Sequence, residues 1–446
     1  MNKFDFQTIS KHTIKPSLPT PNHLKSFHLS FFDQFPPPVY VPVILFYSNP
    51  NPSCEEKIDL LKKSLSETLT QFYMLAGRIR DNTTVECNDE GVEFFEGKIN
   101  GKISDFKTLD DILYQLVPPH VYSIPAPSFA KEVPLVIQVN MFDCGGIAIA
   151  VCMSHKIADA ASITTFINSW ASASRGEFSA GPTFDSNILF PARQITFHVP
   201  DPYEDISSQN EKFVTKRFVF DAAKLTALRA KIIGTSSTMK YPTRVEAVSA
   251  LIWKLAVKSS RYPSDVSLVH HVVNLRKRID PPLSNTSFGN LVSMATTMCT
   301  SSTVAELDEL VGLLREGINQ INCEYIKRMQ DDEFLKSTAE KAAVNGSKNE
   351  ASDETLPTVY WMSSWCNFSL YESDFGWGNP AWVTASLNLL VAENGAIMMD
   401  TKCGKGIEVW LKLEEEQMVR FEHDHELVEF VSLGQGLEQM ELGLST

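Results

Sequence analysis

The chain has 446 residues, of which 43% are hydrophobic and 21% are charged. Because a single hydrophobic core stops growing near ~250–300 residues, this length predicts at least two domains, and the composition excludes a wholly disordered, collagen-like or coiled-coil protein. The formal net charge of −14 argues against general binding to nucleic acid or to an anionic membrane surface.

The first part of the chain is predicted to mix helices and strands. Residues 54–75 carry apolar side chains at helical spacing, which indicates an amphipathic helix. Residues 135–142 and 147–153 flank the sequence Asp-Cys-Gly-Gly, a pattern typical of a β-hairpin. The second of these strands is almost wholly apolar, so we expect a central strand that is buried on both faces. A helix is expected to follow, ending near residue 174.

A linker is predicted at residues 200–212, PDPYEDISSQNEK, because Pro, Asp, Glu, Ser and Asn dominate it and little can be buried. It would separate an N-terminal domain, residues 1–199, from a C-terminal domain, residues 213–446. A strand is expected at 216–220. Asp221 then suits the N-cap of a helix that ends near residue 234.

Two Thr-x-x-Glu capping boxes predict further helices in the second half. The first begins at Thr243 and predicts a helix to about residue 260. The second begins at Thr303 and predicts a long helix toward residue 329. The polar stretch 337–357 is expected to be a surface loop. Strands and helices in both halves together indicate a mixed α/β fold.

The eight cysteines are scattered and form no C-x-x-C pair, so they predict reduced thiols rather than a zinc ribbon or a disulfide framework. No basic segment followed by an apolar segment opens the chain, and the longest apolar run, 147–153, is much shorter than the ~20 residues of a membrane helix. We therefore expect a cytoplasmic protein that has no nucleic-acid or membrane partner. A monomer is expected as well.

The first candidate for chemistry is His155-x-x-x-Asp159, which lies between the apolar strand and the next helix. Histidine suits a general base because its unperturbed pKa lies close to working pH. In this interpretation Asp159 fixes the loop around His155. Two alternatives remain open on local sequence: Asp159 only caps the helix, or both residues ligate a metal. No third His or Cys at ligand spacing supports a metal, so none is expected.

Two further motifs attract attention. Asp374-Phe375-Gly376-Trp377-Gly378, hereafter the DFGWG turn, has two glycines around one Trp, which indicates a tight backbone. Alone, it is at least as well explained as a structural turn that buries the Trp. The basic run 274–278, NLRKR, is followed closely by Ser287-Phe288-Gly289-Asn290. Taken alone, such a run is most often a solvated loop.

Together these motifs resemble the plant BAHD acyltransferases, the family that moves an acyl group from coenzyme A to an alcohol or amine. HxxxD and DFGWG, in this order and separation, are the two signatures of that family, and SFGN matches a third feature. The similarity covers essentially the whole chain, from LAGR at 75–78 to DTKCG at 400–404. It is strongest toward the branch of alkaloid O-acetyltransferases, particularly in VHHVVNLRKRIDPPL at 269–283.

This resemblance implies an α/β fold of two chloramphenicol-acetyltransferase-like domains. Each would be a mixed β-sheet with flanking helices, and a crossover loop would join them. His155 would lie in a channel between the domains and deprotonate the acceptor hydroxyl, which attacks the thioester in a ternary complex. Asp159 would pair with Arg276 and have a structural role. Acetyl-CoA, or another short acyl-CoA, would be a co-substrate, with no permanently bound cofactor.

The resemblance also assigns roles to the DFGWG turn. Asp374, often named beside the histidine, would hold its own loop, with Gly376 and Gly378 supporting it. Trp377 would lie near the reacting centre, where its indole N–H could steady the tetrahedral oxyanion.

Coenzyme A needs local donors and cations despite the acidic total charge. Thr243 and Arg244, at the start of a predicted helix, are candidates for a phosphate site through the helix dipole and free N–H groups. Plain capping of that helix explains them equally well.

We therefore expect a coenzyme A-dependent O-acyltransferase that acetylates a hydroxyl of an alkaloid-like specialised metabolite. The alternatives are a terpenoid or phenolic acceptor, a non-catalytic ligand-binding paralogue, and a thiol hydrolase that uses Cys152. Two departures from the family bear on the substrates. Asn367 replaces a common Arg, which predicts an acceptor without a carboxylate. Asn379 replaces a common cation, which predicts slightly weaker binding of the donor.

Overall fold

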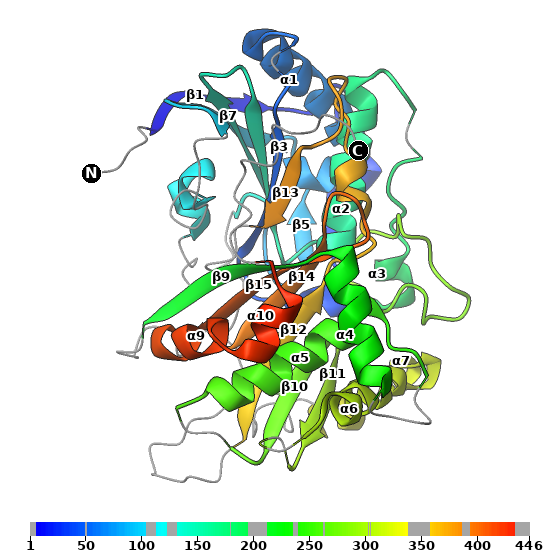
Figure 1. Ribbon diagram of the computed structural model, residues 1–446. Coiled ribbons are helices and arrows are strands. Elements are labelled where there is room, and N and C mark those ends of the chain that lie inside the picture. The colour runs from blue at the N-terminus through cyan, green and yellow to red at the C-terminus, as the bar shows by residue number, and fades with distance from the viewer. Residues whose placement is uncertain are drawn as a thin grey trace.

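The computed structural model describes residues 6–49, 51–103, 113–122, 132–178, 180–194, 212–234, 240–261, 264–301, 303, 305–337, 357–385 and 393–432. Within these ranges, two six-stranded sheets and their helices form two bodies, which lie one above the other in Figure 1. Both sheets contain parallel and antiparallel neighbours. The predicted mixed α/β fold is confirmed.

The first body is built on a sheet with the order β1-β6-β7-β8-β3-β13. Its strands are β1 (Phe6–Ile14), β3 (Tyr40–Tyr47), β6 (Val92–Ile99), β7 (Leu135–Phe142), β8 (Ile147–Ser154) and β13 (Trp382–Ala385). Two helices that pack against each other, α1 (Cys54–Gln71) and α2 (Ala160–Ser174), belong to this body. A small sheet of β2 (Ser26–His28), β5 (Thr84–Glu86) and β4 (Arg78–Ile79) lies beside it.

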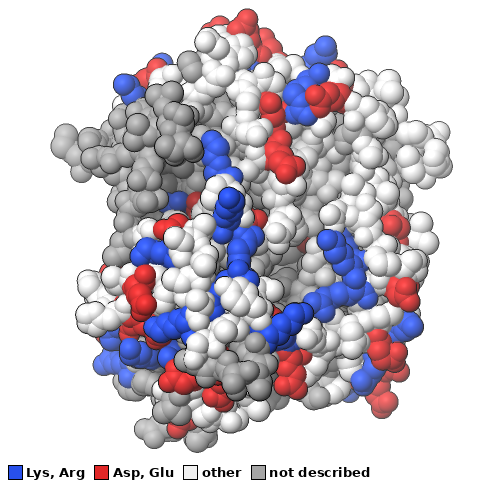
Figure 2. Space-filling model, turned by 45° about the vertical axis from the view of Figure 1, so that its right-hand side comes forward, with Lys and Arg blue, Asp and Glu red and all other residues white. Residues whose placement is uncertain are grey.

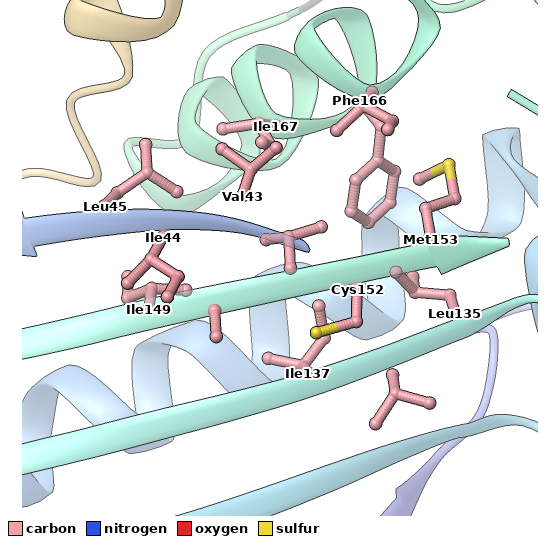
Figure 3. Close-up of a cluster of buried hydrophobic side chains, with 14 of the residues drawn as sticks. Val43, Ile44, Leu45, Leu135, Ile137, Ile149, Cys152, Met153, Phe166 and Ile167 are labelled. Atoms are coloured by element: carbon pink, nitrogen blue, oxygen red, sulfur yellow. The ribbon is translucent and has the colours of Figure 1, made fainter. Parts of the chain in front are cut away.

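Strand β8 lies between β7 and β3, and all eight of its residues are buried, as the apolar sequence predicted. Figure 3 shows the alternation along this strand: Met153 points toward Phe166 of α2, whereas Cys152 points to the opposite face, near Ile137. Both faces are thus covered by apolar side chains, which explains why the strand lacks a polar face.

The second body has the sheet order β11-β10-β12-β14-β15-β9. Its strands are β9 (Phe213–Phe220), β10 (Ser267–Asn274), β11 (Val292–Cys299), β12 (Thr358–Ser364), β14 (Gly395–Asp400) and β15 (Ile407–Glu414). Its helices are α4 (Ala222–Gly234), α5 (Arg244–Ser259), α6 (Leu307–Gln320), α7 (Cys323–Arg328), α9 (Glu415–Glu422) and α10 (His425–Phe430). Figure 1 shows α4, α5, α6 and α9 together on one side of this sheet.

Short helices fill several connections. They are α3 (Ser186–Leu189) and the 3-10 helices η1 (Asn22–Leu24), η2 (Phe32–Gln34), η3 (Tyr73–Ala76), η5 (Leu113–Leu116), η6 (Pro119–Tyr122) and η7 (Ser369–Glu372).

One strand crosses between the two halves of the chain. β13 comes late in the sequence, yet it pairs antiparallel with β3 and completes the edge of the first sheet. The two bodies are therefore joined by a shared sheet as well as by packing. The predicted linker, 200–212, lies outside the described residues except for Lys212, so the domain boundaries stay a prediction.

Most local predictions about helix ends are confirmed. Thr243 caps α5 in a complete capping box with Glu246. Asp221 accepts a hydrogen bond from the backbone N–H of Lys224 at 2.9 Å, as expected for the cap of α4. The hairpin of β7 and β8 is present, with residues 143–146 in its turn.

The long helix predicted from Thr303 is wrong. The Thr303 hydroxyl bonds Asp265 instead of a helix N–H, and α6 begins only at Leu307. The helix then ends at Gln320, because Asn322 accepts from the N–H of Tyr325 and caps a new helix, α7. Of the loop predicted at 337–357, residues 338–356 lie outside the described residues.

The described residues contain no membrane-spanning helix and no cluster of metal ligands. None of their helices is both long enough and apolar enough to cross a bilayer. In the same ranges, no group of three or more His, Cys, Asp or Glu side chains is arranged to hold a metal ion. All eight cysteines of the chain are free thiols.

Candidate active site

His155 follows directly after β8, in the loop that leads into α2. Its backbone N–H donates to the carbonyl of Val39 at 2.8 Å, which ties the loop to the segment before β3. The imidazole is only half-buried. A buried central strand therefore holds a partly accessible histidine at its end, as the sequence predicted.

Asp159 caps α2, because its Oδ1 accepts from the backbone N–H of Ser162 at 2.9 Å. The same carboxylate also receives a bidentate ion pair from Arg276 of the second body, at 2.7 and 3.0 Å. Arg276 is fully buried, and Asp159 is 4% exposed. Capping and pairing, which the sequence left as alternatives, both occur, and Asp159 joins the two bodies beneath the His155 loop.

The remaining donors of Arg276 are also satisfied. Nε donates to the carbonyl of Ser287 at 3.0 Å, and Nη1 reaches Asn274 Oδ1 at 3.3 Å. Nη2 also lies within hydrogen-bond distance of Ser162 Oγ, at 3.0 Å, and of the Gly289 carbonyl, at 3.2 Å. Burial alone would raise the pKa of Asp159, but the Arg276 charge and several hydrogen bonds outweigh it and lower the pKa. Asp159 is therefore an ionised structural anchor and has no free proton-accepting position toward a substrate.

Asn290 determines which nitrogen of His155 carries the proton. The Asn290 amide nitrogen donates to the backbone carbonyl of His155 at 2.7 Å and to Asp33 Oδ1 at 2.9 Å. Its Oδ1 therefore faces His155 Nδ1, at 3.1 Å, and can only accept. We assign the proton to Nδ1, which leaves the lone pair on Nε2.

Burial favours the neutral form of this imidazole. Burial lowers the pKa of His155, while the Asp159 charge and hydrogen bonds to Asn290 and to backbone oxygens partly oppose the shift. The net direction is downward from the ordinary value. At neutral pH the ring is thus in the form that can accept a proton.

The DFGWG turn does not lie near His155. The Trp377 ring packs on Tyr47, with ring centroids 6.0 Å apart, and Tyr47 pairs with Ile147 at the start of β8. Lys57 Nζ lies 5.9 Å from the Trp377 ring and donates to the carbonyl of Gly145, in the turn before β8, at 3.1 Å. His155 follows the other end of the strand.

Seven residue steps of β8 separate these two ends, a length of roughly 23 Å. This separation does not favour the predicted contact of the Trp377 N–H with the reaction oxyanion, which stays a prediction. Trp377 is 6% exposed, and its indole nitrogen has no hydrogen-bond partner among the described residues. The alternative interpretation, a turn that buries a Trp, describes this part of the molecule.

Asp374 organises the DFGWG turn. Its Oδ1 accepts from the backbone N–H groups of Gly376 and Gly378 at 2.7 and 2.8 Å. Both glycines have positive φ, +106° and +101°, a conformation that side chains rarely tolerate. The expected structural role of Asp374 and of the two glycines fits these contacts.

The groups proposed to bind coenzyme A are engaged within the protein. Arg244 donates to Asp400 at 2.9 Å and to the carbonyl of Gly404 at 2.6 Å. Thr243 Oγ1 accepts from the Glu246 N–H at 3.1 Å, and the Glu246 carboxylate accepts from the Thr243 N–H at 2.7 Å. These contacts favour capping and anchoring, and a role in donor binding stays a prediction.

The two positions that depart from the family lie in different places. Asn367 is exposed and has φ of +67°. It follows the carboxyl end of β12, beside the carboxyl end of the parallel strand β10, which leads into Arg276. Asn367 therefore lies at the end of the sheet that faces the HxxxD loop. Asn379 is exposed beside the DFGWG turn, at the opposite end of β8.

The structure disfavours the thiol hydrolase. Cys152 is fully buried in the middle of β8, and burial raises the pKa of its thiol well above the ordinary value. A thiol in such surroundings is inert as a nucleophile.

Sequence reasoning missed two contributors, the Asn290–His155 hydrogen bond and Asp33 behind it. These residues are far apart along the chain, so no local spacing connects them. The SFGN motif drew attention to Asn290 in the sequence but did not indicate what this residue does. For Asp33 there was no signal.

The chain is similar to known proteins over nearly its whole length. The family model described as "Transferase family" matches residues 4–428. Salutaridinol 7-O-acetyltransferase of Papaver somniferum is 43% identical over 474 residues, covering 95% of this chain and 98% of that protein. A second Papaver somniferum protein, (13S,14R)-1,13-dihydroxy-N-methylcanadine 13-O-acetyltransferase AT1, is 42% identical over 472 residues, with the same coverage.

Among solved structures, the crystal structure of vinorine synthase superposes with a TM-score of 0.78 at 33% identity, covering 96% of this chain and 99% of that one. Sequence and fold thus agree over nearly the full length. The chain belongs to the Transferase family and is a BAHD-type acyl-CoA-dependent O-acyltransferase.

Proposed function

We propose that this enzyme transfers an acetyl group from acetyl-CoA to a hydroxyl of an alkaloid-like specialised metabolite. His155 is the general base in a ternary complex. The observation that carries the proposal is the Asn290–His155 hydrogen bond, because it leaves the Nε2 lone pair as the proton acceptor. The names of the two Papaver relatives support an acetyl donor and an alkaloid acceptor.

The proposed reaction has two stages. As His155 Nε2 takes the proton of the acceptor hydroxyl, the hydroxyl oxygen attacks the thioester carbonyl carbon and a C–O bond forms. The tetrahedral intermediate then collapses, the C–S bond breaks, and the coenzyme A sulfur takes the proton from the imidazolium. The ester and the free thiol leave with all protons accounted for, and no acyl-enzyme forms.

The surface supports an anionic donor despite the net charge of −14. Figure 2 shows a face on which Lys and Arg side chains gather around a hollow. Such a rim raises the local concentration of a phosphate-bearing ligand. We propose that coenzyme A enters from this face, with Thr243 and Arg244 among the candidate contacts.

The acceptor is proposed to lack a carboxylate. Asn367 lies at the end of the second sheet that faces the HxxxD loop. Members of the family often have an Arg at this position, and an Arg can bind a carboxylate in a bidentate pair. A panel of neutral and cationic alcohols with quinate and shikimate, read by mass spectrometry, tests this. Preference for quinate or shikimate would contradict it. Terpenoid and phenolic alcohols in the panel test the alternative acceptor classes.

Release of free thiol from acetyl-CoA tests the reaction itself. We expect release only when both substrates are present, whereas a hydrolase needs only water and a non-catalytic paralogue releases none. His155→Ala should lower kcat by at least ~10²-fold and leave coenzyme A affinity nearly unchanged. His23→Ala, at an exposed position, is the control and should keep full activity. Wild-type turnover in His155→Ala would show that His155 is not the general base.

A monomer and a cytoplasmic location complete the proposal. Sedimentation equilibrium and a fluorescent fusion in plant cells check the two statements.

A further inference from the structure

Asp33 is the next member of the hydrogen-bond chain that begins at His155. It lies in η2 and is 2% exposed. The backbone N–H and the side-chain amide of Asn290 donate to its Oδ1 at 2.7 and 2.9 Å. The backbone N–H and the hydroxyl of Ser30 donate to its Oδ2 at 2.7 and 2.6 Å. Four donors converge on two oxygens, the arrangement that an ionised carboxylate accepts.

We propose that Asp33 is a positioning residue for proton transfer, which locks the Asn290 amide in the one orientation that keeps His155 protonated at Nδ1. The proposal rests on the proposed function of His155 as base. It adds a residue on a third segment of the chain, remote in sequence from both the HxxxD and SFGN motifs.

The two ends of the Asn290 amide differ in their hydrogen bonding, because the oxygen only accepts and the nitrogen only donates. Turning the amide by 180° exchanges its oxygen and nitrogen at almost no steric cost. In the turned orientation, Asn290 Oδ1 would face Asp33 Oδ1 and the His155 carbonyl, so acceptors would oppose acceptors. The amide nitrogen would then face His155 Nδ1 and favour a proton on Nε2, where the lone pair is needed. Burial raises the pKa of Asp33, and the hydrogen bonds from Ser30 and Asn290 oppose that rise. A hydrogen bond to an ionised carboxylate is stronger than one to a neutral acceptor, so Asp33 selects the productive orientation.

The segment that carries Asp33 is itself fixed to the catalytic loop. Lys156 is 1% exposed, and its ammonium donates to the carbonyls of Gln34 and Pro36 at 3.1 and 2.9 Å. Because Lys156 follows His155 in sequence, these two hydrogen bonds fix the position of η2 relative to the His155 loop.

Several other charged groups surround His155. They are Asp159 and Arg276 from the ion pair, Lys156, and Glu132, which accepts from Ser154 Oγ at 2.8 Å. Any change of charge at Asp33 therefore also acts on the pKa of His155 through space. The pH profile alone does not separate that effect from an effect through Asn290, so the test combines a mutant cycle with a direct readout of the tautomer.

The cycle compares Asp33→Asn, Asn290→Ala and the double variant, with acetyl-CoA and the identified acceptor. Each single change should lower kcat by at least ~10-fold, with little change of KM for acetyl-CoA, since a wrong histidine tautomer can cost up to ~10⁴-fold. The double variant should be no slower than Asn290→Ala alone. Losses that multiply in the double variant would overturn an action through Asn290.

The tautomer is read by ¹⁵N NMR of histidine-labelled protein, with the His155 signals identified by their loss in His155→Gln. The wild type should show protonated Nδ1 and unprotonated Nε2, and Asp33→Asn should lose this single form. Asp89→Asn is the matched control, because Asp89 binds Thr20 and Lys25 instead. An unaltered His155 tautomer in folded Asp33→Asn would overturn the proposal.

Two provisions keep the test decisive. If Asp33→Asn does not fold, Ser30→Ala removes one of the four donors and should produce a smaller loss of the single tautomer. An unchanged tautomer in that variant would count against Asp33. The NMR readout needs neither substrate, so a failure of the acetyl-transfer proposal is distinguishable from a failure of this one.

Discussion

At the scale of single residues, the lowered pKa of His155 predicts the pH dependence of acyl transfer. The base must be unprotonated, so kcat/KM should rise with pH as His155 loses its proton. Burial shifts that pKa downward, and the midpoint of the acidic limb should therefore lie below ~6.5, the unperturbed value. Initial rates between pH 4.5 and 8 measure the limb. A midpoint above 6.5 would show that the ring is not held in its neutral form.

The buried ion pair of Asp159 and Arg276 predicts a loss of stability. Asp159→Ala leaves the fully buried Arg276 guanidinium without its partner, which should cost about 3–5 kcal/mol. We expect a lower unfolding midpoint and lower soluble yield, with activity lost as the loop around His155 loosens. Lys212→Ala is a useful comparison, because the pair of Lys212 with Glu415 is exposed and should matter little. A thermally unaltered Asp159→Ala variant would contradict the anchoring role.

At the scale of elements, the DFGWG turn should matter for stability and not for the chemical step. Gly378 has φ of +101°, and open space surrounds the position of an added Cβ, so Gly378→Ala should be destabilised by strain alone, about 1–3 kcal/mol. Gly312→Ala is the matched control, because Gly312 lies inside α6 with equally open surroundings, and Ala there should be neutral or stabilising.

The two glycine variants separate structure from catalysis when kcat is measured well below the unfolding temperature. Gly378→Ala should then keep the turnover and pH profile of the wild type, because the turn lies at the far end of β8 from His155. A large fall in kcat with unchanged stability would show that the turn contributes directly to catalysis.

Elements with local causes were the predictable part of the fold. The β7–β8 hairpin, the buried β8 and the capping box at Thr243 each depend on residues within a few positions of one another. The box at Thr303 failed because a distant partner, Asp265, took the hydroxyl that the helix needed. Local patterns predict an element unless a tertiary contact competes for the same side chain.

The same distinction applies to the site. His155 and Asp159 are four residues apart in one motif, and a family resemblance supplied Arg276. The position of Trp377 depends on the register of β3 against β8 and on the turn that follows η7, which a motif does not encode. Asn290 and Asp33 act through contacts across 135 and 257 residues of chain, so only the folded structure connects them.

At the scale of the whole molecule, the site is complete only where the two bodies meet. The first body supplies the His155 loop and η2, and the second supplies Arg276 and Asn290. The β13–β3 pairing adds a second junction between the bodies. Proton acceptance is therefore a property of the assembled pair and not of either body.

This assembled interior also holds several histidines that resist protonation, which predicts how stability changes with pH. Besides His155, they are His270 and His271 of β10, which are 2% and 4% exposed. Burial lowers both pKa values, to about 4 for His270. Between pH ~6.5 and 4 the unfolded chain binds more protons at these histidines than the folded chain does. The free energy of unfolding therefore falls as the pH falls.

His270 alone should remove about 2 kcal/mol of unfolding free energy between pH 7.5 and 5.0, as follows from pKa values of ~6.5 unfolded and about 4 folded. His270→Gln should flatten this dependence, because glutamine does not titrate and can still bond Thr296, the partner of His270 Nδ1 at 2.8 Å. His23→Gln, at an exposed position, should leave the dependence as it is in the wild type. Urea unfolding followed at both pH values measures the difference. If the unfolding free energy changed equally between the two pH values in His270→Gln and in the wild type, protonation of His270 would not limit the stability in acid.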